Sequence, residues 1–278
     1  MMLADELYAR WAKGRYYIDL FEKSVDKISR ADSLFSDEES RSVFRGILQA
    51  YADTSGSAYK FLQSVASFDP DESYAHFVAN DGYEVRGPHN PYFLNDIFSF
   101  EEEVVFLDGG AFIGDTLGLA QEFFGDKLAF YHAFEPNEQH FKKLEEASTR
   151  IAAPGVLLRK GLDDHNGSTA FLMSGAGSRI DSQGDVRIET VSAKDYLRNV
   201  SELPTFIKLD IEGAEQRVLC SMRDFIAANG PDLAISAYHA LDDLWEIPLA
   251  IHGILPDYRI YMRHQSNYFT ETICYATL

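Results

Sequence analysis

Cysteine is scarce and long apolar runs are missing from this chain of 278 residues. Its two cysteines, Cys220 and Cys274, are too few and too far apart for a disulfide-stapled fold or a zinc cluster, and we expect both to be reduced core residues. No apolar run approaches the roughly 18 residues of a membrane-spanning helix. The first residues lack the basic and apolar segments of a secretion signal. These absences predict a soluble, cytoplasmic protein.

Basic residues are also few, because 25 Lys and Arg stand against 44 Asp and Glu, a formal net charge of −19. Binding to nucleic acid or to an anionic membrane surface needs basic patches, so we expect neither partner. No internal repeat or low-complexity segment is present. With 46% hydrophobic residues the chain can bury a full core, and its length suits one large domain or a medium domain with an appendage.

The first 100 residues are typical of helices with one apolar face each. Apolar residues recur at helical spacing at Tyr17, Phe21, Val25 and Ile28. Residues 36–39 have a capping-box pattern that begins a second helix, and a shorter helix is expected through 61–65. Residues 69–91 are polar and loop-like. We expect this region to pack on the domain that follows, where it either shapes the mouth of a binding site or holds a homodimer together. Its aromatics Trp11, Tyr16 and Tyr17 are assigned to packing.

From residue 101 onward, strand and helix patterns alternate. Strands are expected at 104–108, 129–134, 156–158, 206–210 and 233–239, with helices between them. The segments at 258–262 and 272–276 are predicted to pair as a final antiparallel ribbon, and two short β-type runs occur at 169–172 and 187–191. This alternation predicts an α/β fold, with a mostly parallel sheet covered on both faces and ligands at the carboxyl ends of its strands.

Residues 104–116 are the most informative stretch. A buried strand ends at Asp108, glycines follow at 109, 110 and 114, and a helix begins near Asp115. Nicotinamide-binding folds place their acid about 20 residues after the glycines. Here an acid precedes the glycines, which favours S-adenosylmethionine over a dinucleotide. The glycines are expected to let the backbone approach the ligand without a Cβ in the way.

Four polar residues close predicted strands and therefore meet at one edge of the sheet: Asp108, Glu135, Asp210 and His239. One carboxylate can accept hydrogen bonds from both hydroxyls of a ribose, and Glu135 is placed for that role. Lys208 lies inside a strand and must be paired, with Glu212 or Glu215 as the simplest partner.

A hydroxyl acceptor needs a base, for which Asp210, Glu212 and His239 are candidates. His264 is a weaker candidate. A metal held by Asp210, Glu212 and His239 is an alternative route to activating a hydroxyl. No ligand spacing requires one, so the prediction is that the site holds no metal.

Three segments, 108–116, 134–137 and 207–215, resemble the signature segments of the FkbM family of class I S-adenosylmethionine-dependent methyltransferases. The likeness extends over roughly residues 90–278 and includes Tyr238, His239 and the segment 243–245. One departure is Phe112, where the broad class usually has glycine and this family often has asparagine. The resemblance implies a Rossmann-like, seven-stranded, mostly parallel sheet with the last strand antiparallel, plus the N-terminal helical region.

The resemblance also implies roles for individual residues. Asp210 would face the reacting centre, Glu135 with Pro136 and Asn137 would hold the ribose, and Gly161 with Leu162 would border the adenine. The methionine part would lie against Asp108, Gly109, Gly110, Ala111, Phe112, Gly114, Asp115 and Thr116.

The domain prediction is therefore a helical cap at 1–100 and a methyltransferase domain at 101–278. The expected activity is O-methylation of a small-molecule acceptor such as a sugar, glycan precursor or polyketide. N-methylation of a peptide or amino sugar, and a non-catalytic binding protein with a retained cofactor pocket, remain alternatives.

Overall fold

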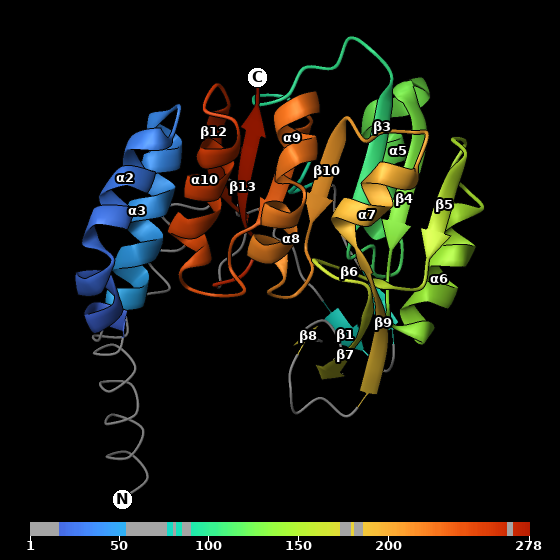
Figure 1. Cartoon of the computed structure of the whole chain (residues 1–278), viewed down its shortest axis with the longest axis horizontal. Coiled ribbons are helices and arrows are strands. Elements are labelled where there is room, and N and C mark those ends of the chain that lie inside the picture. The colour runs from blue at the N-terminus through green and yellow to red at the C-terminus, as the bar shows by residue number, and fades with distance from the viewer. Residues whose placement is uncertain are drawn as a thin grey trace, which may run out of the picture.

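A seven-stranded sheet forms the centre of the molecule in the computed structural model, which describes residues 17–53, 77–79, 82–84, 90–172, 179–180, 186–265 and 269–278. The strand order is β12-β13-β11-β10-β3-β4-β5 (Figure 1). The strands are β3 (Val104–Gly109), β4 (Leu128–Phe134), β5 (Gly155–Leu158), β10 (Phe206–Leu209), β11 (Asp232–Ser236), β12 (Arg259–His264) and β13 (Thr272–Thr277). Neighbours are parallel except β13, which is antiparallel to both β11 and β12. The predicted α/β sheet with its last strand reversed is confirmed.

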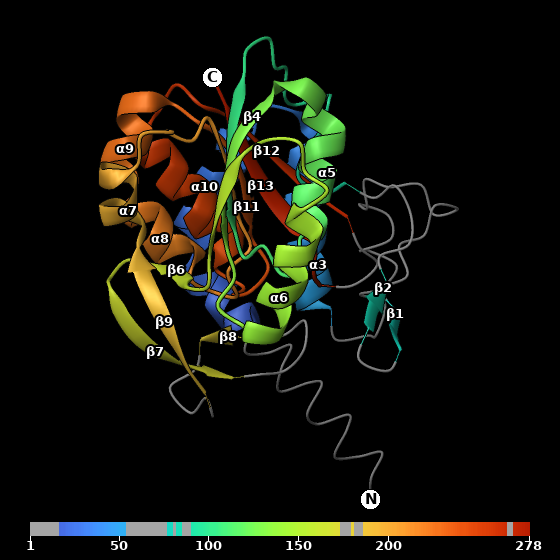
Figure 2. The ribbon, with the colours of Figure 1, turned by 90° about the vertical axis from the view of Figure 1, so that its right-hand side faces the viewer.

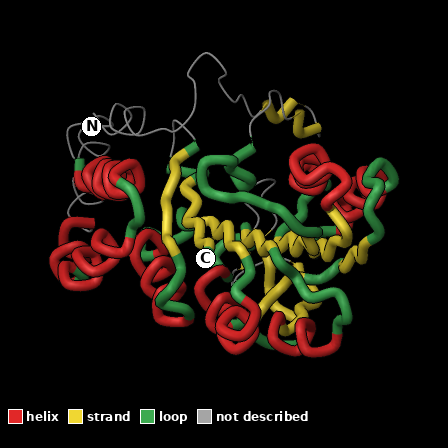
Figure 3. Tube along the Cα trace, turned by 90° about the horizontal axis from the view of Figure 1, so that it is seen from above, coloured by secondary structure: helices red, strands yellow, loops and turns green. Residues whose placement is uncertain are grey.

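Helices cover both faces of this sheet (Figures 2 and 3). One face carries α5 (Asp115–Phe124) and α6 (Glu138–Ser148), with the short η2 (Gly125–Lys127) between α5 and β4. The other face carries α7 (Ala193–Asn199), α8 (Glu215–Ser221), α9 (Arg223–Asn229) and α10 (Asp243–Ile254). Among the described residues, no helix combines the length and apolarity needed to cross a membrane.

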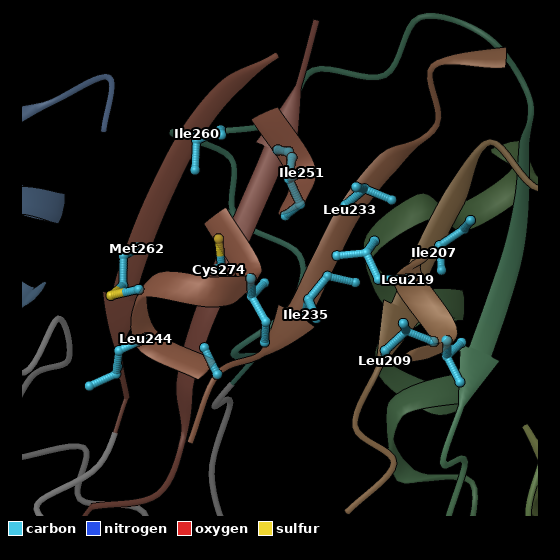
Figure 4. Close-up of a cluster of buried hydrophobic side chains, with 14 of the residues drawn as sticks. Ile207, Leu209, Leu219, Leu233, Ile235, Leu244, Ile251, Ile260, Met262 and Cys274 are labelled. Carbon is cyan, nitrogen blue, oxygen red and sulfur yellow. The ribbon is translucent and has the colours of Figure 1, made fainter. Parts of the chain in front are cut away.

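Alternation along the strands divides the core into two clusters, one on each face. Phe106 and Phe206 pack with Leu117 of α5, while their chain neighbours Leu107 and Ile207 belong to the opposite cluster. Figure 4 shows part of that second cluster, in which side chains of α8 and α10 lie against those of β10, β11 and β12.

The two cysteines have different surroundings. Cys274 lies in the second cluster as predicted, but Cys220 is exposed, so its prediction as a core residue is wrong. Cys220 belongs to the amphipathic α8, and it lies on the side of that helix which faces away from the core.

The N-terminal helices extend the core rather than stand apart from it. Residues 17–23 are helical, and α2 (Val25–Leu34) and α3 (Glu38–Ala52) follow. Helix α2 packs on α10 and α3 packs on the edge strand β12, so that Phe44 and Ile47 share a cluster with the sheet. Val25 is 60% exposed and does not belong to the predicted apolar face. The expected helix at 61–65 and the aromatics Trp11 and Tyr16 lie outside the described residues.

Helix α3 begins with a different cap from the one predicted. Asp37, not Ser36, accepts a hydrogen bond from the Ser40 N–H at 2.8 Å. The Ser36 hydroxyl instead accepts the Ile260 N–H of β12 at 3.0 Å. The buried Ser40 hydroxyl accepts both the Met262 N–H and Arg263 Nη1, each at 2.9 Å. The helix start is therefore bonded to the edge of the sheet.

Replacing Ser40 by alanine should lower the free energy of unfolding by about 1–3 kcal/mol, because a buried N–H and a buried guanidinium lose an acceptor. Denaturant unfolding of the full chain measures the loss. Ser33→Ala is the matched control, since Ser33 is exposed on α2 and donates only within its own helix, to the Arg30 carbonyl. Equal stability of the two variants would contradict this account of the junction.

A second sheet lies beyond the carboxyl ends of β3, β4 and β10 (Figure 1). It contains β6 (Gly161–Asp163), β9 (Val186–Ser192), β7 (Gly167–Leu172) and β8 (Arg179–Ile180), in that order across the sheet. The two predicted β-type runs fall in β7 and β9 and are confirmed. A hairpin of β1 (Phe77–Ala79) and β2 (Gly82–Glu84) occurs where a loop was expected. Each strand has three residues, which is too short to show a strand pattern.

Candidate active site

The glycine turn after β3 bonds four of its backbone N–H groups within the protein. Gly110 and Ala111 both donate to the Phe134 carbonyl, at 3.0 and 2.8 Å. Phe112 donates to Glu135 Oε2 at 3.0 Å, and Gly114 donates to the Ala111 carbonyl at 2.8 Å. A phosphate-binding turn must present such groups to its ligand. This turn is therefore not arranged to hold the pyrophosphate of a dinucleotide.

Phe112 has a backbone conformation that glycine or asparagine would adopt readily. Its φ of +48° lies in the left-handed region. Its ring meets the His140 ring edge-on, with centroids 4.4 Å apart. The departure from the family pattern thus changes the side chain at this position while the backbone remains in the region that the usual residues favour.

The glycines of the turn allow other parts of the protein to approach closely, and their expected role beside a ligand stays a prediction. A Cβ on Gly110 would lie 1.9 Å from the Asp210 carbonyl oxygen, and the φ of this residue is +79°. A Cβ on Gly114 would lie 2.7 Å from the Ala147 Cβ in α6. Two of the signature segments, 108–116 and 207–215, therefore touch through their backbones at Gly110.

Substituting alanine at Gly110 should cost at least about 2 kcal/mol of stability, because both the backbone conformation and the Asp210 carbonyl exclude a Cβ. Gly118→Ala provides the control, since no atom lies within 4 Å of a Cβ placed there in α5. That change should be neutral or stabilise by up to about 1 kcal/mol. Thermal and denaturant unfolding compare the two, and similar stabilities would refute the close approach.

Lys208 is paired with Asp108 and not with the predicted Glu212 or Glu215. Its Nζ donates to Asp108 Oδ1 at 2.9 Å and to the Gly110 carbonyl at 2.6 Å, with both charged side chains buried. β10 lies beside β3 with Lys208 opposite Asp108, so both side chains point to the same face. Burial works against the ammonium, but the Asp108 and Asp210 carboxylates outweigh it and raise the pKa of Lys208.

Two buried carboxylate oxygens beside this pair have no hydrogen-bond donor within the described part of the chain. They are Asp108 Oδ2 and Asp115 Oδ1. Burial raises the pKa of the Asp115 carboxyl, which begins helix α5. Leaving such atoms without a donor is costly, so this corner of the site suits a ligand that brings a positive charge or an N–H group.

Glu135, which was predicted to bind the ribose, accepts hydrogen bonds from the turn after β3 and from the turn after β4. Oε2 accepts the Phe112 N–H, and Oε1 accepts the Asn137 N–H at 2.8 Å. Each oxygen keeps one lone pair for a ligand hydroxyl. Asn137 caps α6 by accepting hydrogen bonds from the N–H groups of Gln139 and His140. Pro136 lies between Glu135 and Asn137 in the sequence.

The remaining predicted cofactor residues lie in regular structure. Gly161 and Leu162 are buried in β6, where they pair with Thr190 and Val191 of β9. Thr116 is buried in the first turn of α5. No contact in the structure assigns these residues to a ligand, so their roles stay predictions.

The three predicted catalytic residues come together after β10 and β11. His239 Nε2 lies 3.4 Å from both Asp210 Oδ1 and Glu212 Oε2. Its Nδ1 lies 3.0 Å from Oε1 of Glu215, whose carboxylate also accepts the N–H groups of Ile211 and Gly213. One imidazole is therefore surrounded by three carboxylates.

The carboxylates determine the charge of this histidine. Burial opposes a charged ring, but Glu215, Asp210 and Glu212 raise the pKa of His239 to about 10. An imidazolium has no lone pair to accept a proton, so the structure favours a carboxylate as the base. Burial, with help from Asp210 and Glu215, raises the pKa of Glu212 to about 8.

A cation could also use this geometry, because ligand atoms of Asp210, Glu215 and His239 lie within 4.8 Å of one another. Glu215 already accepts two backbone N–H groups and Asp210 accepts two tyrosine hydroxyls. A protonated His239 supplies the positive charge that the carboxylates need. These interactions occupy acceptor positions that a metal would need, and the absence of a metal stays a prediction.

Two residues beside Asp210 were not predicted. Tyr92 donates to Asp210 Oδ2 at 2.8 Å, and its preceding Asn90 accepts the Tyr92 and Phe93 N–H groups. That Asx turn is the one signal in the sequence that could have marked Tyr92. Glu271, at the tip between β12 and β13, has a φ of +60°, and burial raises its pKa to about 8. No motif marks Glu271.

His264, the weaker candidate, is fully buried in β12, and its Nδ1 lies 2.9 Å from Thr272 Oγ1 on β13. This is a cross-strand contact within the sheet. A histidine without exposed surface is a packing residue here.

Comparison with known proteins identifies the fold. A curated protein, the hexuronic acid methyltransferase AglP of Haloferax volcanii, is 30% identical over 146 residues, which cover 50% of this chain and 58% of that protein. The structure of the methyltransferase FkbM from Methylobacillus flagellatus KT superposes with a TM-score of 0.70 at 21% identity, covering 93% of this chain and 60% of that one. The chain has the fold of an FkbM methyltransferase.

The resemblance to FkbM methyltransferases predicted from the three segments is thus confirmed at the level of the fold, and the matched sequence relative is also a methyltransferase. No protein-family model matches the chain. The chain spans less than two-thirds of the length of either protein, at 58% and 60%.

Proposed function

We propose that this chain is an S-adenosylmethionine-dependent methyltransferase that acts on a hydroxyl group of a small molecule. The observation that carries the proposal is the turn at 109–114, in which the N–H groups of Gly110, Ala111, Phe112 and Gly114 are bonded within the protein while two neighbouring carboxylate oxygens lack donors among the described residues. Such a turn suits a cationic ligand without phosphates. The fold and the methyltransferase relative support the same conclusion.

The residues present fit this methyl donor. Asp108 Oδ2 and Asp115 Oδ1 would hold its ammonium group, since both are buried acceptors that lack a donor. Glu135 would hold the ribose through the lone pairs that the turn leaves free. Bound there, the donor would supply a methyl group on a sulfonium sulfur, open to in-line attack when the acceptor is held close.

The acceptor's proton would pass to Glu212. Its side chain is 29% exposed, its pKa is about 8, and it lies beside the imidazolium of His239, which would keep the carboxylate in place. Asp210 is less suited to take a proton, because His239, Lys208 and two tyrosine hydroxyls outweigh its burial and lower its pKa. A base works best when its pKa is near the working pH, which favours Glu212.

The acceptor end of the site favours an uncharged or cationic molecule. Above the pKa of about 8 of Glu212 and Glu271, the four carboxylates of Asp210, Glu212, Glu215 and Glu271 outnumber the two cations beside them, the His239 imidazolium and the Lys208 ammonium, among the residues the structure describes. Carboxylates bind sugar hydroxyls well but repel an anionic acceptor. We therefore propose a neutral sugar or a related hydroxyl compound, and not the uronic acid for which the Haloferax relative is named.

Transfer from methyl-labelled S-adenosylmethionine to a panel of neutral sugars, amino sugars, uronic acids and short peptides tests this proposal. We expect label in neutral sugars, attached to oxygen. Label on nitrogen of an amino sugar or peptide would establish the N-methyltransferase alternative. Donor binding without transfer to any class would favour the non-catalytic binding protein.

A further inference from the structure

Tyr92 and Tyr238 lie on opposite sides of the Asp210 carboxylate. The Tyr92 hydroxyl donates to Oδ2 at 2.8 Å, and the Tyr238 hydroxyl donates to Oδ1 at 3.1 Å. The three residues come from different parts of the chain: the segment before β3, the end of β10 and the end of β11. We propose that the two tyrosines form a clamp that fixes the orientation of the Asp210 carboxylate, which makes them positioning residues of the site. This inference rests on the proposed function for its purpose, but its geometry does not depend on it.

Tyr92 is itself held from several directions. Asn90 Oδ1 accepts the N–H groups of Tyr92 and Phe93, at 3.2 and 2.9 Å, and the Tyr275 hydroxyl donates to the Pro91 carbonyl. Lys208 Nζ lies 5.2 Å from the centre of the Tyr92 ring, within the range of a cation–π contact. With only 5% of its surface exposed, Tyr92 cannot move away from Asp210 without disturbing these contacts.

The clamp connects the part of the site proposed to bind the methyl donor with the part proposed to bind the methyl acceptor. The Lys208 ammonium beside the Tyr92 ring also donates to Asp108 and to the Gly110 carbonyl, while the Tyr92 hydroxyl donates to Asp210. Tyr238 is next in sequence to His239, which lies 3.4 Å from Asp210. With one lone pair of each oxygen taken by a phenol, the remaining acceptor capacity of Asp210 has fixed directions.

The clamp has a consequence that simple packing would not have. A hydrogen bond donated to a carboxylate favours its charged form. His239 and Lys208 act in the same direction on Asp210, while burial and the neighbouring Glu212, Glu271 and Asp108 oppose them. Replacing either tyrosine by phenylalanine removes one donor but keeps the ring, so the pKa of Asp210 should rise in each variant and further in the double variant.

Carbon-13 NMR of the full chain labelled at aspartate carboxyls tests this, with the Asp210 signal identified by its loss in Asp210→Asn. We expect its titration to move to higher pH in Tyr92→Phe and in Tyr238→Phe. Tyr196→Phe is the matched control, because that hydroxyl contacts His132 at 2.8 Å, away from Asp210, and the titration should stay at the wild-type position.

An unchanged Asp210 titration in both folded variants would overturn the clamp, and so would an equal shift in Tyr196→Phe. If one variant fails to fold, the other decides by the same criterion. The proposed function fails by a different result, which is wild-type protein that does not bind S-adenosylmethionine. The two failures are therefore distinguishable.

Discussion

Glu212→Gln should reduce methyl transfer by about a hundredfold to ten-thousandfold, the usual range for loss of a positioned general base. Glutamine keeps the size of the side chain but cannot take a proton from the acceptor. In the wild type, the pKa of Glu212 is raised to about 8 by burial and by the neighbouring carboxylates. Since the base must be ionised to act, the wild-type rate should rise with pH through this value and level off above it.

Rates measured across pH with the best acceptor of the panel check both expectations, and the rise should be absent in Glu212→Gln. Glu145→Gln on the exposed side of α6 is the control and should match the wild type. A Glu212→Gln enzyme with the wild-type rate and the same pH dependence would exclude Glu212 as the base. Asp210 would then remain as the other carboxylate predicted to act as a base.

Lys208→Met should lower the free energy of unfolding by about 3–5 kcal/mol, because it leaves the buried Asp108 carboxylate without its cation. Lys208 donates to Asp108 and to the Gly110 carbonyl, and both charged side chains are almost completely buried. Methionine retains most of the volume of the lysine side chain, so the loss of stability measures the removal of the charge and not the creation of a cavity.

Denaturant unfolding of the single variants and the double variant Asp108→Asn/Lys208→Met measures the coupling between the two residues. The double variant should be clearly less destabilised than the sum of the single ones. Lys142→Met is the control, since its pair with Glu138 is exposed and should contribute less than about 1 kcal/mol. Equal losses of unfolding free energy in Lys142→Met and Lys208→Met would show that the buried pair contributes no more to stability than the exposed one.

The sheet and the residues at its strand ends were predictable from local patterns. Apolar runs that end in Asp108, Glu135 and Asp210 define both the strands and the edge where they meet, because parallel strands place their carboxyl ends together. The alternation of strands and helices also indicates that helices cover both faces of the sheet. These features depend on residues close in sequence.

Contacts between distant segments were not predictable in this way. Lys208 pairs with Asp108, 100 residues earlier, because β10 lies beside β3, and nothing in either segment encodes that adjacency. Tyr92 reaches Asp210 across 118 residues for the same reason. A role for Gly110 beside a ligand was expected from the sequence, but the group that excludes a Cβ there is the Asp210 carbonyl, directly after β10 and far along the chain.

The charge state of His239 likewise needed the structure. A histidine at a strand end is an obvious candidate base when only the sequence is known. Three carboxylates that surround it, one of them Glu215 in α8, reverse that role by holding the ring as a cation. Asp210 and Glu212 were both candidate bases, and the proposed division of work between them rests on the two tyrosine hydroxyls that bind Asp210 and on the opposite shifts of the two pKa values.

Calorimetric titration of the full chain with S-adenosylmethionine and, separately, with NAD tests the central claim most directly. We expect saturable binding of S-adenosylmethionine and no binding of NAD, because carboxylate oxygens on either side of the turn at 109–114 lack donors among the described residues, while the N–H groups of Gly110, Ala111, Phe112 and Gly114 are already bonded within the protein. Binding of NAD with no binding of S-adenosylmethionine would contradict that claim.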